Sequence, residues 1–313
     1  MKKVFLALLF SISLFSLAQE KNFKTESIEI DSMIKGTLFT PEKITKKTKL
    51  VILIAGSGPT NRSGNQFGGL TNNLKFLSED LVNKNIAVFS FDKRVIALIR
   101  KGITNENSMV FDDMISDTEN VVNYFKNNKK FKKIIIAGHS EGSLIGMIVA
   151  KKTKADGFIS LAGAGRPIYE VLEEQLLKQL PYFSKQIKQN IQNYKEAKTF
   201  DYTSKDATMM GVFKPSIQPY FISWSKYVPT VEIKKLKIPI LIVNGTKDLQ
   251  VPESDAHLLK NAYPKAKIEI IENMNHLFKE TPTEAENLKS YNDGTIPVMP
   301  ILSEKMAEFI NSI

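Results

Sequence analysis

The sequence predicts an α/β fold in which a mostly parallel central sheet is flanked by helices. Short apolar runs typical of buried strands alternate with segments whose apolar residues recur at helical spacing. This alternation indicates successive βαβ units. One stretch, residues 167–230, has no strong strand pattern and indicates a helical insertion. We therefore expect residues 19–313 to form one domain that carries 167–230 as a cap.

The individual elements follow from local patterns. Residues 26–31 and 33–41 alternate enough to predict an antiparallel pair at a sheet edge. Continuous apolar runs, expected for strands buried on both faces, lie at 49–56, 86–92, 132–138, 157–165, 238–245 and 267–272. Apolar stripes at helical spacing predict helices around 74–82, 111–125, 144–149, 254–263 and 302–313.

Residues 1–18 have the layout of a secretory signal peptide. Two lysines precede the apolar run Val4–Leu17, and the small residues Ser16 and Ala18 suit a cleavage before Gln19. The run is shorter than the roughly 20 residues that a membrane span needs. We expect a cleaved signal, an exported protein that is periplasmic or secreted, and no stable membrane insertion after cleavage.

Composition and charge exclude several kinds of site and partner. The chain has no cysteine, which rules out disulfides, thiolate metal sites, a lipid-modified cysteine and a cysteine nucleophile. The net charge is +10, but the lysines are scattered. No basic stripe is interleaved with aromatic residues, as a nucleic-acid surface would require. We expect a solvated basic surface and no nucleic-acid partner, and no oligomeric state is predicted.

The segment IIIAGHSEGSLIGMIVA, residues 134–150, combines a predicted strand, a tight turn and a predicted helix. Gly138 and Gly142 stand two residues before and after Ser140, which lets the strand and the helix approach closely. Ser140 would then stand exposed at the carboxyl end of the sheet, as in a nucleophile elbow. The pattern alone arises by chance in roughly one chain in ten of this length, so its position between strand and helix is what makes it informative.

A serine nucleophile needs a base, and the chain has three histidines. His139 lies inside the turn, where we expect it to point away from the serine and to pack or bind backbone. His257 lies on a predicted helix beside Asp255 and is expected at the surface. His276 follows the strand predicted at 267–272, at the sheet edge where open α/β sheets place their sites. His276 is therefore the predicted general base.

An acid is needed to orient that histidine, and Asp248 is the predicted one. It lies in the loop after the strand at 238–245, and it fits the chain order Ser, Asp, His. The alternative is that Asp248 only caps a helix or a turn. Asp92 is a weaker rival that we interpret as a structural ion pair beside Lys93 and Arg94.

These residues predict acyl transfer. Ser140 would attack a carbonyl carbon while His276 takes its proton and Asp248 holds the imidazole tautomer. The oxyanion needs two donors, and the Glu141 amide is one of them. We expect the Ser57 amide to be the other, because it directly follows the first parallel strand.

The loop that holds Ser57 reads GSGPT, and it has two alternative interpretations. Gly58 offers a second amide for the oxyanion, and the glycines can also form a plain turn. A Walker phosphate loop is excluded, because no Gly-Lys followed by Ser or Thr comes after it.

Several stretches resemble a branch of bacterial α/β-hydrolases, exported or cytosolic, known as esterases or serine aminopeptidase-like enzymes. They are VILIAGSGPTNRSGNQ, FDKR, GHSEGS, SWSKYVPTVEIKKLKIPILIVNGTKDLQVP, MNHLFK and YNDGTIPVMPIL. The resemblance implies an α/β-hydrolase fold with a helical cap over the site. It also implies a Ser140–Asp248–His276 triad and hydrolysis of carboxylic esters without a cofactor or metal.

Three departures from the family pattern concern the rim of the pocket. Asn61 and Ser63 stand where the family usually has aspartates, and no Gly-x-Gly-x-Ser follows Asp-Lys-Arg. Ser143 replaces the third glycine of the elbow. Aromatic residues of the predicted cap can line an apolar acyl pocket or simply hold the cap to the core. They are Tyr169, Tyr182, Phe183, Phe213, Tyr220, Phe221, Trp224 and Tyr227.

The sequence thus predicts a serine hydrolase whose substrates are small carboxylic esters with short acyl chains. Two alternatives stay open. A serine peptidase or aminopeptidase would need a carboxylate near the pocket for the substrate ammonium, for which Glu170, Glu173 and Glu174 are candidates that also fit a solvated helix face. The other alternative is a catalytically silent binding protein of the same fold.

Overall fold

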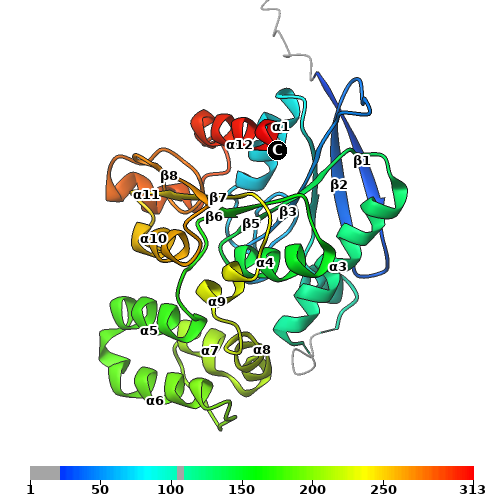
Figure 1. Ribbon diagram of the computed structural model, residues 1–313. Coiled ribbons are helices and arrows are strands. Elements are labelled where there is room, and N and C mark those ends of the chain that lie inside the picture. Colours follow the sequence, from blue (N-terminus) through cyan, green and yellow to red (C-terminus); the bar gives the residue numbers. More distant parts are fainter. Residues whose placement is uncertain (1–21, 104–108) are drawn as a thin grey trace, which may run out of the picture.

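The computed structural model describes residues 22–103 and 109–313 (Figure 1). The predicted signal peptide, residues 1–18, lies outside the described residues. Within them the strands are β1 (Phe23–Glu29), β2 (Lys35–Pro41), β3 (Leu50–Ile54), β4 (Ala87–Phe91), β5 (Ile134–His139), β6 (Gly157–Leu161), β7 (Ile240–Gly245) and β8 (Lys267–Ile271).

These strands form a single mixed sheet in the order β1-β2-β4-β3-β5-β6-β7-β8. The pairs β1–β2 and β2–β4 are antiparallel, and every other neighbouring pair is parallel. The residues of β3 to β7 are all buried, which explains their continuous apolar sequences, whereas β1 is mostly exposed at the edge. The prediction of a mostly parallel sheet with an antiparallel edge pair is confirmed.

Helices cover both faces of this sheet (Figure 1). One face packs against α1 (Asn73–Asn83) and α12 (Pro300–Ser312), whose apolar residues share a core cluster with the sheet. The other face packs against α3 (Phe111–Asn128), α4 (Glu141–Thr153), α9 (Pro229–Lys234) and α10 (Glu253–Ala262). This arrangement is that of an α/β-hydrolase fold.

The chain between β6 and β7 is helical and extends away from the sheet. It contains α5 (Ile168–Gln179), α6 (Ser184–Lys195), α7 (Ala207–Phe213) and α8 (Gln218–Trp224), with short 3₁₀ turns at Pro181–Phe183 and Pro215–Ile217. Together with the start of α9 these elements occupy the segment 167–230, which we call the helical insertion. It has a small apolar core of its own around Ile187, Tyr194 and Phe213.

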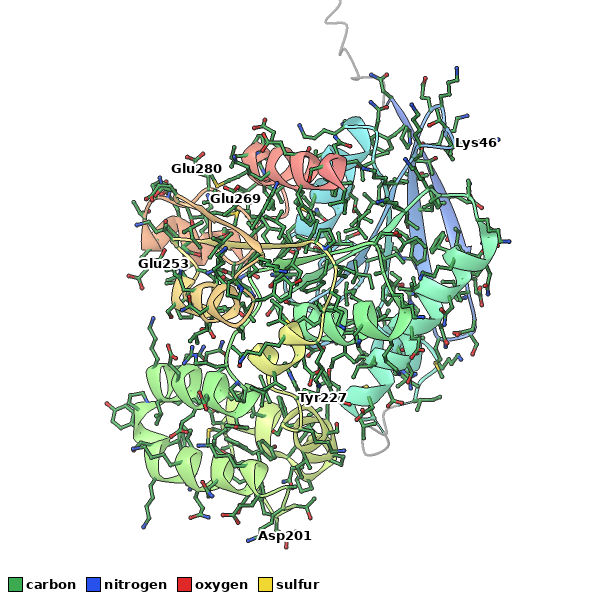
Figure 2. The ribbon with its side chains drawn as sticks, in the orientation of Figure 1. Lys46, Asp201, Tyr227, Glu253, Glu269 and Glu280 are labelled. Atoms are coloured by element: carbon green, nitrogen blue, oxygen red, sulfur yellow. The ribbon has the colours of Figure 1, made fainter. Side chains whose placement is uncertain are left out.

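Helix α8 joins the insertion to α3. The ring of Trp224 stacks on that of Phe111 with centroids 5.1 Å apart, and the Phe111 amide donates to the Ser223 hydroxyl at 2.7 Å. Figure 2 shows Tyr227 where the insertion meets the main body and Asp201 at the outer end of the insertion. The insertion is therefore attached along α8, while its outer end is remote from the sheet.

Two helices were not predicted from the sequence. Helix α2 (Arg94–Arg100) directly follows β4, and α11 (Glu284–Ser290) lies between β8 and α12. Within the described residues, no helix is both long enough and apolar enough to cross a bilayer.

The strand order fixes where a site can form. Strand β3 pairs with β4 on one side and with β5 on the other, so the chain winds away from β3 in both directions. A crevice opens at the carboxyl ends of the strands at such a switch point. The loops that leave β3 and β5 carry Ser57 and Ser140, which therefore face the same crevice.

Candidate active site

Ser140 lies in a sharp turn between β5 and α4. Its backbone has φ 53° and ψ −119°, a conformation that non-glycine residues rarely adopt. The flanking glycines are required by space. A Cβ at Gly138 would lie 2.0 Å from the carbonyl oxygen of Gly142, and one at Gly142 would lie 2.6 Å from that of Ile54. The predicted elbow geometry is present, with a strained serine at the start of a helix.

His276 and Asp248 meet on neighbouring loops. Asp248 follows β7 and His276 follows β8, and the distance from His276 Nδ1 to Asp248 Oδ2 is 2.8 Å. Both side chains are buried, with exposed fractions of 3% and 0%. Asp248 Oδ1 also accepts the backbone N–H groups of Gln250 and Val251, each at 2.8 Å. The carboxylate is thus held in place. Because it accepts the hydrogen bond from His276, the imidazole proton lies on Nδ1, and Nε2 is left as an acceptor.

Ser140 and His276 line one cavity of about 450 Å³, which we call the histidine-side cavity. Its other lining side chains are uncharged and mostly polar, and include Thr60, Gln66, Asn73, Gln250 and Tyr291. The structure therefore brings the predicted nucleophile and base to one space, with the predicted acid behind the base.

Two further cavities adjoin Ser57 and Glu141. The insertion-side cavity, of about 260 Å³, is also lined by Ser140 and by apolar residues of α4, α5 and α8, including Leu144, Val171, Leu172, Phe221 and Trp224. The α2-side cavity, of about 400 Å³, is lined mainly by apolar residues of α2, α3 and α8. Of the predicted cap aromatics, Phe221 and Trp224 line both cavities.

The residues of the predicted oxyanion donors lie on either side of Ser140, in the loop after β3 and at the start of α4. A Cβ added to Gly56 would lie 3.3 Å from Ser140 Cβ, so the loop after β3 passes directly beside the serine. Ser57 is the next residue. Glu141 is the first residue of α4, and the N–H groups of a first helical turn have no partner within the helix. Both residues therefore lie next to Ser140, one in the loop after β3 and one at the start of α4.

His139 makes the backbone hydrogen bond expected from its place in the turn, and it also lines the histidine-side cavity. Its Nε2 donates to the backbone carbonyl of His276 at 2.9 Å, and the two rings lie 4.7 Å apart. Burial, with the nearby His276 ring as a second cause, holds the pKa of His139 well below 6.5. His139 thus supports the loop of the predicted base in its neutral form. His257 is exposed on α10.

The rival acid Asp92 and the buried Asp255 both have structural partners. Asp92 forms the ion pair expected of it, but its partners are Arg62 at 2.8 Å and Arg100 at 3.1 Å, not its neighbours in the sequence. Asp255, buried on α10, pairs with Arg166 at 2.8 Å. Neither carboxylate lines the three cavities described above.

Sequence reasoning missed a buried polar cluster beside the elbow. The cluster consists of Lys93, Glu141 and Tyr220, which come from three separate segments. Lys93 and Tyr220 both donate a hydrogen bond to Oε1 of Glu141. No local pattern signals this cluster, because its members are 48 and 79 residues apart.

Across the described ranges, no group of three or more His, Asp or Glu side chains is arranged to hold a metal ion.

Comparison with known proteins gives matches of two kinds. Residues 68–282 match the model of the family described as serine aminopeptidase, S33. Esterase EstD of Thermotoga maritima is 28% identical over 244 residues, which cover 75% of this chain and 57% of EstD. The chain thus spans little more than half the length of that relative.

Solved structures with a similar fold include two esterases. Est1E from Butyrivibrio proteoclasticus superimposes with a TM-score of 0.59 at 18% identity, over 92% of this chain and 99% of Est1E. The Pyrococcus furiosus esterase Pf2001 has a TM-score of 0.56 at 16% identity, over 93% of this chain and 90% of Pf2001. At this identity the two structures are evidence for the fold alone.

Proposed function

The chain belongs to the serine aminopeptidase S33 family of α/β-hydrolases, and we propose that it is a serine esterase acting on small carboxylic esters with short acyl chains. One observation carries the proposal. Ser140 sits in a strained turn and shares a cavity with His276, whose Nδ1 is held by Asp248. This arrangement suits a nucleophile, its base and the group that orients the base.

In the proposed reaction, His276 Nε2 takes the Ser140 hydroxyl proton as Oγ bonds to the ester carbonyl carbon. The carbonyl oxygen becomes an oxyanion that accepts hydrogen bonds from the Ser57 and Glu141 amides. The carbon–oxygen bond to the alcohol then breaks, and His276 returns the proton to the leaving alcohol. Water, deprotonated by His276, attacks the acyl-enzyme, and the carboxylic acid is released with Ser140 restored.

The same steps orient the substrate. His276 protonates the leaving group, so the alcohol has to lie in the histidine-side cavity. The acyl group then extends into the insertion-side cavity, where Leu144 and Leu172 offer apolar surface. We propose that the helical insertion caps this acyl side. A neutral, hydrogen-bonding alcohol and an apolar acyl group fit the two linings.

Two observations favour esters over peptides. The curated relative EstD is named an esterase. The glutamates considered for binding a substrate ammonium do not line the three cavities. Glu174 pairs with Arg166, Glu173 pairs with Lys195, and Glu170 is exposed. None of these three glutamates therefore lies where the peptidase alternative needs a carboxylate.

Labelling with a fluorophosphonate tests the proposed nucleophile directly. The wild-type protein should gain the mass of one phosphonyl group, and Ser140→Ala should gain none under the same conditions. An unlabelled wild type would instead favour the catalytically silent binding protein.

We also propose that the protein is exported, to the periplasm or the medium. The support is the signal-like layout of residues 1–18. Expression of the full chain in a bacterial host, followed by fractionation and N-terminal sequencing, tests this. Cleavage before Gln19 is the expected result, and an uncleaved cytoplasmic chain would contradict it.

A further inference from the structure

A buried lysine connects the two loops that carry the proposed oxyanion donors. Lys93 lies between β4 and α2, and its side chain is only 7% exposed. Its Nζ donates to Glu141 Oε1 at 2.6 Å and to the carbonyl oxygen of Gly56 at 3.1 Å. One ammonium group therefore binds the loop after β3 and the first residue of α4.

The bond to Gly56 determines the direction of the Ser57 amide. The carbonyl of Gly56 and the N–H of Ser57 belong to one peptide unit, and no peptide bond in the described chain is cis. In a trans peptide the C=O and the N–H point in opposite directions. With the oxygen held by Lys93, the Ser57 N–H has to point to the opposite side of this peptide unit, and the loop that carries it passes beside Ser140.

The bond of Lys93 to the Glu141 side chain holds the residue whose backbone N–H is the other proposed oxyanion donor. The Glu141 side chain is fully buried, and its backbone N–H is the donor directly after Ser140. Tyr220, from the helical insertion, donates to the same Oε1 at 2.9 Å. Burial first, and then the Glu141 charge, raise the pKa of Tyr220 well above 10, so the phenol keeps its proton as a donor.

Oε2 of Glu141 has no hydrogen-bond partner among the described residues, so the carboxylate is held through Oε1 alone. A buried ion pair of this kind is weak evidence for a stabilising role, since apolar replacements of such pairs are often neutral or stabilising. Its geometry is more informative than its energy. Lys93 contacts one residue of each proposed oxyanion loop.

We propose that Lys93 is a positioning residue, which sets the Ser57 and Glu141 amides at the oxyanion through its bonds to Gly56 and Glu141. The inference rests on the proposed esterase function. Oxyanion donors act only when they lie about 2.7–3.1 Å from the developing charge, so a small rotation of either peptide unit would reduce transition-state stabilisation.

The test uses a double variant that leaves no unpaired charge. Lys93→Met alone would strand the buried Glu141 carboxylate, so Lys93→Met is combined with Glu141→Gln. The matched control is Arg94→Met combined with Asp117→Asn. It removes the ion pair of Arg94 with Asp117, 2.6 Å long, together with the bond of Arg94 to the half-buried Asp113 at 3.0 Å, and neither bond contacts an oxyanion loop. Thermal unfolding establishes that each variant is folded, and fluorophosphonate titration counts its reactive Ser140.

We expect kcat per titrated site of the Lys93→Met/Glu141→Gln variant to fall about 10–100-fold on p-nitrophenyl acetate, with KM changed less than threefold. Inhibition by a phenylboronic acid, whose adduct is tetrahedral, should weaken by a similar factor. A merely structural role would lower the number of titrated sites and leave kcat per site unchanged. The control pair should match the wild type in both measurements.

The outcomes separate this inference from the proposed function. A folded Lys93→Met/Glu141→Gln variant with kcat and boronate affinity within twofold of an active wild type would overturn the role of Lys93 and leave the esterase intact. A wild type that neither cleaves esters nor takes the label would overturn both, because there would be no oxyanion to stabilise.

Discussion

Asp248 and His276, 28 residues apart in the sequence, are joined by a 2.8 Å hydrogen bond between Oδ2 and Nδ1. They lie on the loops that leave β7 and β8, which are adjacent parallel strands. Asp248 Oδ1 accepts two backbone N–H groups from its own loop. The loop therefore holds the carboxylate through Oδ1 while Oδ2 contacts the imidazole. The carboxylate can thus set both the orientation of the ring and the position of its proton.

Asp248→Asn should leave the loop intact, because the amide oxygen can still accept the N–H groups of Gln250 and Val251. The amide nitrogen, however, would donate to Nδ1 and place the imidazole in the wrong tautomer. We expect kcat to fall by about 10⁴, as for the corresponding change in a serine protease. Steady-state kinetics on a p-nitrophenyl ester measures this. A loss of less than tenfold would mean that Asp248 only caps its turn.

Ser140→Ala should reduce kcat by on the order of 10⁶ while the unfolding temperature changes little, because the nucleophile is removed without a cavity. Ser143→Ala is the matched control. Ser143 is buried one turn farther into α4, where its hydroxyl bonds that of Ser160 at 2.7 Å. The control should keep activity within a few-fold of the wild type. Substantial turnover by Ser140→Ala would indicate a different nucleophile.

The buried His139 should make stability depend on pH. Its pKa lies well below 6.5 in the folded state because of burial and the neighbouring His276 ring. As pH falls below about 6.5 the unfolded chain takes up a proton at this residue and the folded chain does not. The free energy of unfolding therefore decreases as the pH falls below about 6.5. Above that pH the stabilising contribution of neutral His139 is fully present.

Urea unfolding at pH 7.5 and 5.5 measures this effect. His139→Gln is the matched variant, because its amide can still donate to the His276 carbonyl but does not titrate. The wild-type midpoint should fall more than that of the variant between the two pH values. Equal falls would show that His139 does not contribute.

The insertion-side cavity should determine acyl length. Leu172 of α5 lines it, so Leu172→Phe should reduce its free volume. We expect kcat/KM on butyrate and longer esters to decline at least about tenfold more than on acetate, since extra atoms no longer fit. Lys178→Phe, at an exposed position of the same helix, is the control. A uniform loss across chain lengths would place the acyl group elsewhere.

The sheet could be predicted from the sequence because each parallel strand is a short apolar run buried on both faces. The places of Ser140, Asp248 and His276 in the fold could be predicted in the same way, since each lies in the turn or loop that follows a predicted strand, and their catalytic roles stay a prediction. Helix α11 was missed although the signal was present. Thr283 and Glu286 form a capping box, with the Glu286 amide donating to the Thr283 hydroxyl at 3.3 Å.

Other features depend on contacts between distant segments and leave no local pattern. The sequence indicated an ion pair at Asp92 from its neighbours, but the fold supplies Arg62 and Arg100 instead. The bonds of Lys93 to Gly56 and Glu141 join loops 37 and 48 residues away. Such partners are set by the strand order at the switch point.

The central claim is tested most directly by assaying the protein from Gln19 onward on p-nitrophenyl esters of increasing acyl length, beside aminoacyl-p-nitroanilides. Ser140→Ala is assayed in parallel. The account predicts rapid cleavage of acetate and butyrate esters that Ser140→Ala abolishes, with the anilides untouched. Preferential cleavage of the anilides, or ester hydrolysis that survives Ser140→Ala, would contradict it.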